Sequence, residues 1–270
     1  MFVTDGTRPV TGLSAGDFEL RDNGRRQTVE LASVDTLPLT TYVVLDTGGS
    51  VKGPRLAQLQ AAVRALVGGL PPAEAVALMT FDDEVRQLVP LTTDRRRLVE
   101  AVDAIRPGGA TSLFDALYSA TVLATGRERA LIVLFTDGED TMSWLEAVQL
   151  RRVLEESTVL LQAVTVLEGE ESSARPDWRT NDPESKPEAL LRHLAELTGG
   201  RVWPAASPHA ITDAFLGVLE AMKHRYLLRF EPPAGRNEGR HELEVKLTRR
   251  RGRVHYRRTY VVRPSAPASP

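Results

Sequence analysis

Between residues 41 and 223, short apolar runs alternate with stretches of helical periodicity. The apolar runs, of which 130–135 is the most hydrophobic, contain almost no polar residue, as is typical of strands covered on both faces. The expected strands are 42–45, 75–81, 85–89, 130–135, 158–166 and 201–203, and the expected helices are 54–67, 93–106, 113–124, 143–156, 187–197 and 210–223. This alternation predicts an α/β fold, with a doubly wound, mainly parallel sheet and helices on both of its faces.

The two ends of the chain follow a different pattern, in which apolar and polar residues alternate. The expected strands are 10–13, 17–20 and 28–31 near the start, and 226–230, 241–247 and 254–262 near the end. Turn residues, such as Asp22-Asn23-Gly24, separate the first group. Neither group is large enough to enclose a core of its own, so we expect them to pack together as one small β module beside the α/β domain.

The predicted division of the chain follows from these two patterns. Residues 1–37 and 225–263 form the two halves of the β module, residues 38–224 form the α/β domain, and residues 264–270 form a disordered tail. Within the α/β domain, residues 169–186 are polar, contain two prolines and lack periodicity, which predicts an exposed loop.

Composition and charge narrow the range of partners. The chain has 270 residues, of which 42% are apolar and 26% charged, as in an ordinary folded protein. Its net charge of −2 gives no bias toward nucleic acid or a membrane surface. Residues 223–263 hold 13 Lys and Arg against four Glu, and the glutamates interrupt the basic residues. We interpret this segment as solvated strand faces, because a phosphate-binding patch would have an unbroken block of positive charge.

Cysteine is absent, which excludes disulfides, thiolate metal sites and a cysteine nucleophile. The five histidines are scattered and no pair has metal-ligand spacing. No apolar run approaches the roughly 18 residues of a membrane span, and residues 1–6 do not resemble a signal peptide. The cellular compartment therefore stays unknown.

Three loops of the α/β domain carry oxygen side chains where a strand ends or a helix begins. Asp46 and Ser50 follow the first strand, Thr111 precedes the third helix, and Asp137 follows the most hydrophobic strand. In a doubly wound sheet, such loops meet at the carboxyl edge of the strands. Carboxylate and hydroxyl oxygens, with no His or Cys among them, suit a hard cation such as Mg²⁺, with Mn²⁺ or Ca²⁺ as alternatives. We therefore predict a metal site formed by Asp46, Ser50, Thr111 and Asp137.

Each of these residues has a structural explanation when taken alone. Asp46, Ser50 and Thr111 could cap helices, and Asp137-Gly138 is a common turn sequence. Their joint placement on three loops favours a site. Nearby acidic residues are interpreted differently: Asp115 bonds backbone or loop groups, Asp140 is a supporting or surface residue, and Asp82-Asp83-Glu84 form a solvated turn at the other end of the second strand.

The motifs Asp46-Thr47-Gly48-Gly49-Ser50, Thr111 and Asp137 resemble the metal-ion-dependent adhesion site of the von Willebrand factor type A family. The resemblance spans about residues 41–223 and implies a Rossmann-like fold that binds protein partners. It further implies that Asp46, Ser50 and Thr111 contact Mg²⁺ directly or nearly so, Asp137 contacts it through water, and a partner Asp or Glu completes the shell. This sequence departs from the family motif at one position, because Gly48 replaces its middle serine.

The flanking segments extend the resemblance to a bacterial branch, the VWFA-related domain proteins. Segments 3–27 and 226–260 are similar to the segments that precede and follow the domain in that branch. This resemblance implies export if a targeting segment lies upstream of residue 1.

Three alternatives to a metal-dependent binding module stay open. With Gly48 in place of a serine, the domain could bind partners without metal. Asp46-Thr47-Gly48 matches the aspartic-protease signature, but the second Asp-Thr/Ser-Gly that such enzymes need is absent. A Mg²⁺-dependent phosphoryl hydrolase with Asp46 as nucleophile would need a second carboxylate and a lysine, and Lys52 is the only lysine nearby. We therefore expect a protein that is not an enzyme.

Overall fold

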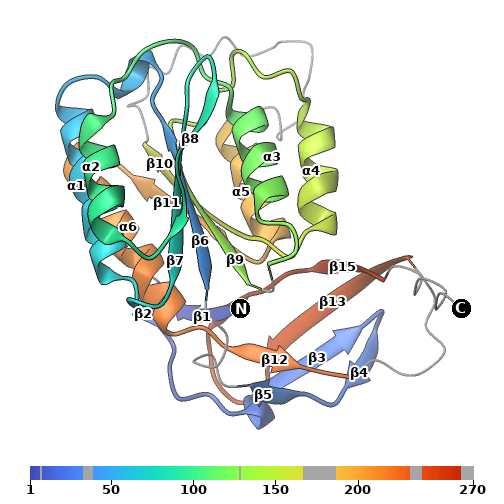
Figure 1. Ribbon diagram of the computed structural model, residues 1–270. Coiled ribbons are helices and arrows are strands. Elements are labelled where there is room, and N and C mark those ends of the chain that lie inside the picture. Colours follow the sequence, from blue (N-terminus) through green and yellow to red (C-terminus); the bar gives the residue numbers. More distant parts are fainter. Residues whose placement is uncertain (7, 33–38, 128, 167–186, 232–238, 263–270) are drawn as a thin grey trace, which may run out of the picture.

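A computed structural model describes residues 1–6, 8–32, 39–127, 129–166, 187–231 and 239–262 (Figure 1). Its centre is a six-stranded sheet with the strand order β11-β10-β9-β6-β7-β8. These strands are β6 (Thr40–Asp46), β7 (Ala75–Phe81), β8 (Val85–Thr92), β9 (Ala130–Thr136), β10 (Leu160–Val166) and β11 (Arg201–Ala205). Every neighbouring pair is parallel except β7 and β8, which form an antiparallel hairpin. The predicted doubly wound, mainly parallel sheet is confirmed.

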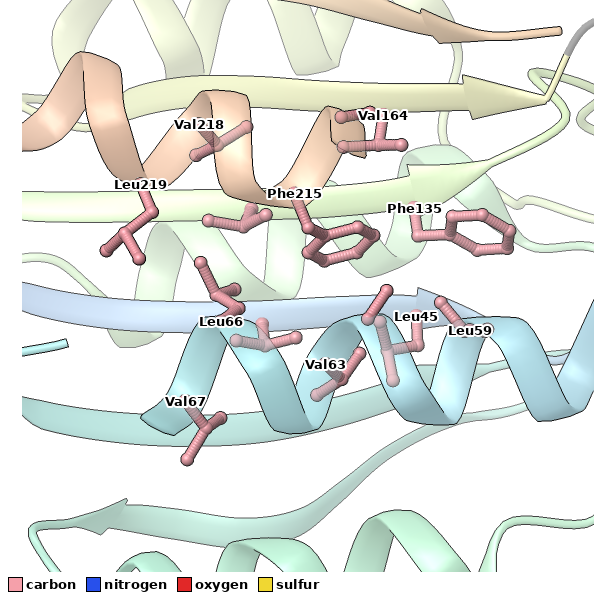
Figure 2. Close-up of a cluster of buried hydrophobic side chains, with 14 of the residues drawn as sticks. Leu45, Leu59, Val63, Leu66, Val67, Phe135, Val164, Phe215, Val218 and Leu219 are labelled. Carbon is pink, nitrogen blue, oxygen red and sulfur yellow. The ribbon is translucent and has the colours of Figure 1, made fainter. Parts of the chain in front are cut away.

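Helices cover both faces of this sheet, and each face has its own hydrophobic core (Figure 1). One face is covered by α1 (Pro54–Gly69), α2 (Arg95–Ala104) and α6 (Pro208–Lys223), and the other by α3 (Leu113–Leu123), α4 (Ala147–Glu156) and α5 (Pro187–Leu197). Figure 2 shows Leu59 and Val63 of α1 and Phe215 of α6 meeting over Leu45 and Phe135 of the sheet. Because these side chains are fully buried, the sheet is a rigid base for the loops at its edges.

Strands from the two ends of the chain pair with each other in small antiparallel sheets. The first half contributes β1 (Phe2–Asp5), β2 (Arg8–Pro9), β3 (Phe18–Asp22), β4 (Arg25–Gln27) and β5 (Glu30–Ala32), and the second β12 (Leu227–Arg229), β13 (Gly239–Leu247), β14 (Arg253–His255) and β15 (Thr259–Val262). The pairs β1–β14, β3–β13 and β5–β12 join the two halves. Phe18, Leu20 and Val245 lie in their shared core, as the predicted β module requires.

The observed elements differ from the predicted ones at several places, among them the short strands β2 and β4, which were not predicted. Residues 10–13 are not a strand, whereas Phe2–Asp5 is one and was not predicted. Strand 254–262 is divided into β14 and β15, because the half-buried Arg257 side chain between them donates to the carbonyls of Leu154 and Val159. Helix 143–156 begins at Ala147, because residues 143–145 are bonded to α3.

Two other predictions lie wholly outside the described residues, namely the exposed loop over 169–186 and the disordered tail over 264–270. In the part of the chain that the structure describes, no helix combines the length and the apolar character needed to cross a membrane.

A substitution at Gly200 tests how closely the segment between α5 and the edge strand β11 packs against β10. A β-carbon added at Gly200 would overlap the Leu161 carbonyl of β10, which is backbone and cannot move aside. We expect Gly200→Ala to lower the free energy of unfolding by about 2–4 kcal/mol, measured by urea denaturation.

Gly68→Ala is the matched control, because a β-carbon at this helical position meets nothing within 4 Å. It should raise stability by about 0.5–1 kcal/mol through helix propensity. Equal effects of the two substitutions would contradict the described packing of β11 against β10.

Candidate functional site

The Asp46 carboxylate lies at the carboxyl end of β6 and is completely buried. Its Oδ1 accepts a hydrogen bond from the Gly48 N–H, and its Oδ2 accepts one from the Thr136 hydroxyl, each at 2.9 Å. Both donors are neutral. These two bonds therefore hold the carboxylate in one orientation, but neither donor carries a positive charge that would balance the charge of the carboxylate.

Ser50 and Asp137 join the first loop to the loop that follows β9. Ser50 lies in a short 3-10 turn, Gly49–Val51, and its hydroxyl donates to Oδ2 of Asp137 at 2.7 Å. The other carboxylate oxygen of Asp137 accepts the N–H of Glu139 at 3.1 Å. Both Ser50 and Asp137 are at least partly open to solvent, so this side of the site can exchange ligands.

Thr111 reaches the same place from the loop before α3. A β-carbon added at Gly48 would lie 2.9 Å from the Thr111 hydroxyl oxygen and 3.1 Å from Oδ1 of Asp46. These two side chains therefore flank Gly48. The structure brings all four predicted residues to one edge of the sheet.

The close approach of the Thr111 loop explains why position 48 is a glycine. Any side chain at position 48 would press on the Thr111 hydroxyl and on the Ala110 carbonyl oxygen, which would be 3.2 Å from its β-carbon. The two loops are also joined by backbone bonds, from Gly49 N–H to the Gly109 carbonyl and from Gly108 N–H to the Thr47 carbonyl. The missing serine hydroxyl is thus replaced by direct packing of one loop on the other.

The electrostatics of the site centre on Asp46. Burial above all, together with the negative charges of Asp137 and Asp82, raises the pKa of this carboxyl to about 7, although the hydrogen bonds from Gly48 and Thr136 lower it. A desolvated carboxylate beside a second carboxylate is costly unless a positive charge compensates it.

Asp82 corrects one interpretation made from the sequence. It was predicted to lie in a solvated turn at the other end of the second strand, and that prediction is wrong for this residue. Since β7 runs parallel to β6, Asp82 follows β7 at the same edge as Asp46, and it is buried. Its carboxylate forms two bonds of 2.7 and 2.8 Å with Arg86. The buried apolar run 75–81 was the signal that could have placed it there, whereas Asp83 and Glu84 are exposed as predicted.

Two further acidic residues fasten the loop after β9 to the first turn of α3. Asp115 accepts the backbone N–H groups of Trp144 and Leu145, both at 3.0 Å, which confirms its interpretation as a residue that bonds loop groups. Asp140 accepts the Ser143 hydroxyl at 2.6 Å and the Phe114 N–H at 3.3 Å, and so acts as a supporting residue.

The side chains at this edge limit the kinds of metal ion that it could bind. Among the described residues there is no group of three or more His, Cys, Asp and Glu arranged for a metal ion. A soft or strongly bound metal therefore has no ligand cage in this part of the chain. Two carboxylates with the hydroxyls of Ser50 and Thr111 fit a hard cation that keeps part of its water shell.

The sheet order, the helices on both faces and the three loops define a von Willebrand factor type A fold. The profile of that family, described as "von Willebrand factor type A domain", matches residues 41–139, which include all four predicted site residues. Residues 41–139 therefore match a von Willebrand factor type A domain, which is generally a protein-interaction module.

Solved structures with the same fold include bacterial proteins. The chain superposes on "von Willebrand factor type A from Catenulispora acidiphila" with a TM-score of 0.58 and 18% identity, over 77% of this chain and 50% of that one. It superposes on the conserved hypothetical protein BatB from Bacteroides thetaiotaomicron with a TM-score of 0.51 and 19% identity, over 68% and 99%. At these identities, the likeness shows the fold alone.

Two curated proteins share part of their sequence with this chain. The E3 ubiquitin-protein ligase WAV3 of Arabidopsis thaliana is 32% identical over 144 residues, which is 50% of this chain and 18% of that protein. Inter-alpha-trypsin inhibitor heavy chain H4 of Bos taurus is 25% identical over 152 residues, or 51% and 16%. The chain thus spans less than a fifth of either relative.

The raised pKa of Asp46 predicts a specific dependence of stability on pH. Because the folded pKa of about 7 exceeds the ordinary 3.8, the folded state binds more protons than the unfolded state between these values. The contribution of Asp46 to stability is therefore full below about pH 4 and is lost as the pH rises toward 7. We expect the melting temperature of Asp46→Asn, measured in EDTA, to depend less on pH over this range than that of the wild type.

Asp213→Asn on the exposed face of α6 is the control for this substitution and should leave the slope unchanged. If the melting temperatures of wild type and Asp46→Asn change equally with pH, the Asp46 carboxyl is not desolvated as described.

Proposed function

We propose that this domain is a metal-dependent protein-binding module without chemistry of its own. In this proposal, Asp46, Ser50, Thr111 and Asp137 hold Mg²⁺, or Mn²⁺ or Ca²⁺ in its place, and a carboxylate of the partner completes the coordination. The family supports the general proposal of protein interaction. The proposal that a metal takes part is supported by the geometry of this edge.

The observation that carries the proposal is the uncompensated carboxylate of Asp46. It is buried, its two hydrogen-bond donors are neutral, and Asp137 adds a second negative charge to its surroundings. The Ser50 hydroxyl lies against Asp137, and the Thr111 hydroxyl flanks Gly48 together with the Asp46 carboxylate. When bound, Mg²⁺ would supply positive charge and a coordination position for an oxygen of the partner.

The chain's own residues would divide the task. Thr136 and the Gly48 N–H fix the orientation of the Asp46 carboxylate. Ser50 and Thr111 offer oxygen ligands, and Asp137, which faces solvent in part, accepts hydrogen bonds from bound water. Since Gly48 contributes no hydroxyl, we expect weaker metal affinity than a site with two serines would have.

A second candidate is partner binding at this edge without metal. Two observations favour it. The Ser50 hydroxyl already donates its proton to Asp137, and Gly48 packs directly on the Thr111 loop. The same surface would then bind a partner through its loops alone.

Metal addition separates the two candidates. Because a ligand that binds only the folded state stabilises it by RT ln(1 + [L]/Kd), Mg²⁺ at ten times Kd should add about 1.4 kcal/mol and raise the melting temperature of wild type over EDTA by a few degrees. Asp46→Ala should abolish this difference, and the control Asp213→Asn should keep it.

Identical melting curves of the wild type in Mg²⁺ and EDTA would favour the metal-independent module. Phosphatase and peptidase assays test the remaining alternatives, and turnover that disappears in Asp46→Ala would overturn a purely binding function.

A further inference from the structure

The loop between β9 and α4 exposes large apolar side chains beside the candidate site. It begins at Asp137, and within it Trp144 is 94% exposed and Met142 54%, while Val148 in the first turn of α4 is 66% exposed. Tryptophan is among the side chains that gain most from burial, and it is enriched at the centres of protein interfaces. An apolar group of this size on an open surface needs a reason.

This loop is firmly attached to its surroundings. The Trp144 and Leu145 N–H groups donate to Asp115, and the Ser143 hydroxyl donates to Asp140 and accepts the Phe114 N–H. The backbone around Trp144 is therefore ordered before any partner arrives. Little further ordering is required on binding, which favours affinity.

The same loop is connected to a residue of the candidate site. The N–H groups of Thr141 and Met142 both donate to the carbonyl of Thr111, at 2.9 and 3.0 Å, and the Thr111 N–H donates to the Thr141 hydroxyl. Trp144 is thus displayed two residues beyond a direct attachment to the Thr111 loop. A partner that reaches the site also lies next to this surface.

The charge of the loop indicates what the partner presents. Residues 137–148 contain four acidic residues and no Lys or Arg. Glu139 and Glu146 are exposed on either side of Trp144 in the sequence. Acidic side chains around an exposed tryptophan disfavour an anionic membrane surface and favour a protein surface of positive charge.

We propose that residues 137–148 form a docking arm, with Trp144 as its central contact. The partner is a protein that receives Trp144 in an apolar socket lined at its rim by Lys or Arg. This inference deepens the proposed function, since it names the chemistry of the partner surface next to the carboxylate-binding site. It depends on Trp144 and the acidic rim, and the metal site depends on Asp46.

A random peptide library displayed on phage tests the arm with the whole chain as bait, in EDTA and separately in Mg²⁺. We expect enriched peptides to combine Lys or Arg with aromatic or aliphatic residues. Their Kd, measured with synthetic peptide, should rise about tenfold or more in Trp144→Ala, as at an interface hot spot. Replacing Glu139 and Glu146 by Gln should weaken the same peptides mainly at low salt.

Val122→Ser is the matched control, because Val122 is a 47% exposed apolar residue near the opposite end of α3. It should leave the peptide Kd unchanged, and melting curves should show that Trp144→Ala is folded. The inference is overturned if no peptide is enriched, if the enriched peptides lack basic or apolar residues, or if Trp144→Ala binds them as tightly as wild type. Self-association that depends on Trp144, seen by light scattering, would identify a second copy as the occupant and would also overturn it.

Comparison of the two buffers separates this inference from the proposed function. Peptide binding that depends on Trp144 but gains nothing from Mg²⁺ supports the arm and counts against the metal site. Binding that requires Mg²⁺ and Asp46 but survives Trp144→Ala supports the metal site and overturns the arm.

Discussion

The parallel pairing of β6 with both β7 and β9 is the constraint on which the rest of this domain depends. In the register of these strands, Asp46 lies opposite Phe81, and Leu45 lies opposite Phe135, so Asp46, Asp82 and Thr136 reach the same edge at nearly the same level. A central strand covered on both faces has no water at its end, and its last side chain is buried with it. A carboxylate at this point is costly to the fold unless a positive charge compensates it, which is the basis of the proposed metal site.

The loops around Asp46 are interlocked in a way that makes them one unit. Backbone bonds join the loop after β6 to residues 108–109, and Thr111 is in turn bonded to Thr141 and Met142 after β9. A shift of any one loop therefore acts on the other two. This arrangement holds site residues from three separate segments without a disulfide or a metal cage, because sheet register and short backbone bonds supply the rigidity.

Much of this architecture could be predicted from the sequence. The strand at 75–81 was predicted at its observed bounds, because a fully buried strand leaves an uninterrupted apolar run. The four predicted site residues were chosen because carboxylates and hydroxyls follow such runs or precede a helix, and the structure places all four at one edge of the sheet. Strand direction was harder, and the burial of Asp82 was missed because a local acidic turn looks the same at either edge of a sheet.

Tertiary contacts account for the features that the sequence did not reveal. Arg257 divides the last strand because its partners are carbonyls about 100 residues away in the chain. Helix α4 begins late because its expected first turn bonds to α3 instead. The exposure of Trp144 follows from the same bonds, and no local pattern distinguishes it from a buried tryptophan. Gly48 likewise has meaning only once Thr111 lies beside it.

The β module lies at the edge of the sheet opposite the candidate site. Its contacts with the α/β domain lie where helices end and strands begin, since Arg257 reaches the carbonyls of Leu154 and Val159, and Arg253 pairs with Glu196 near the end of α5. This is the amino edge of the sheet, opposite the edge that carries Asp46 and Trp144 (Figure 1). The module therefore covers the amino edge and leaves the loops of the carboxyl edge uncovered.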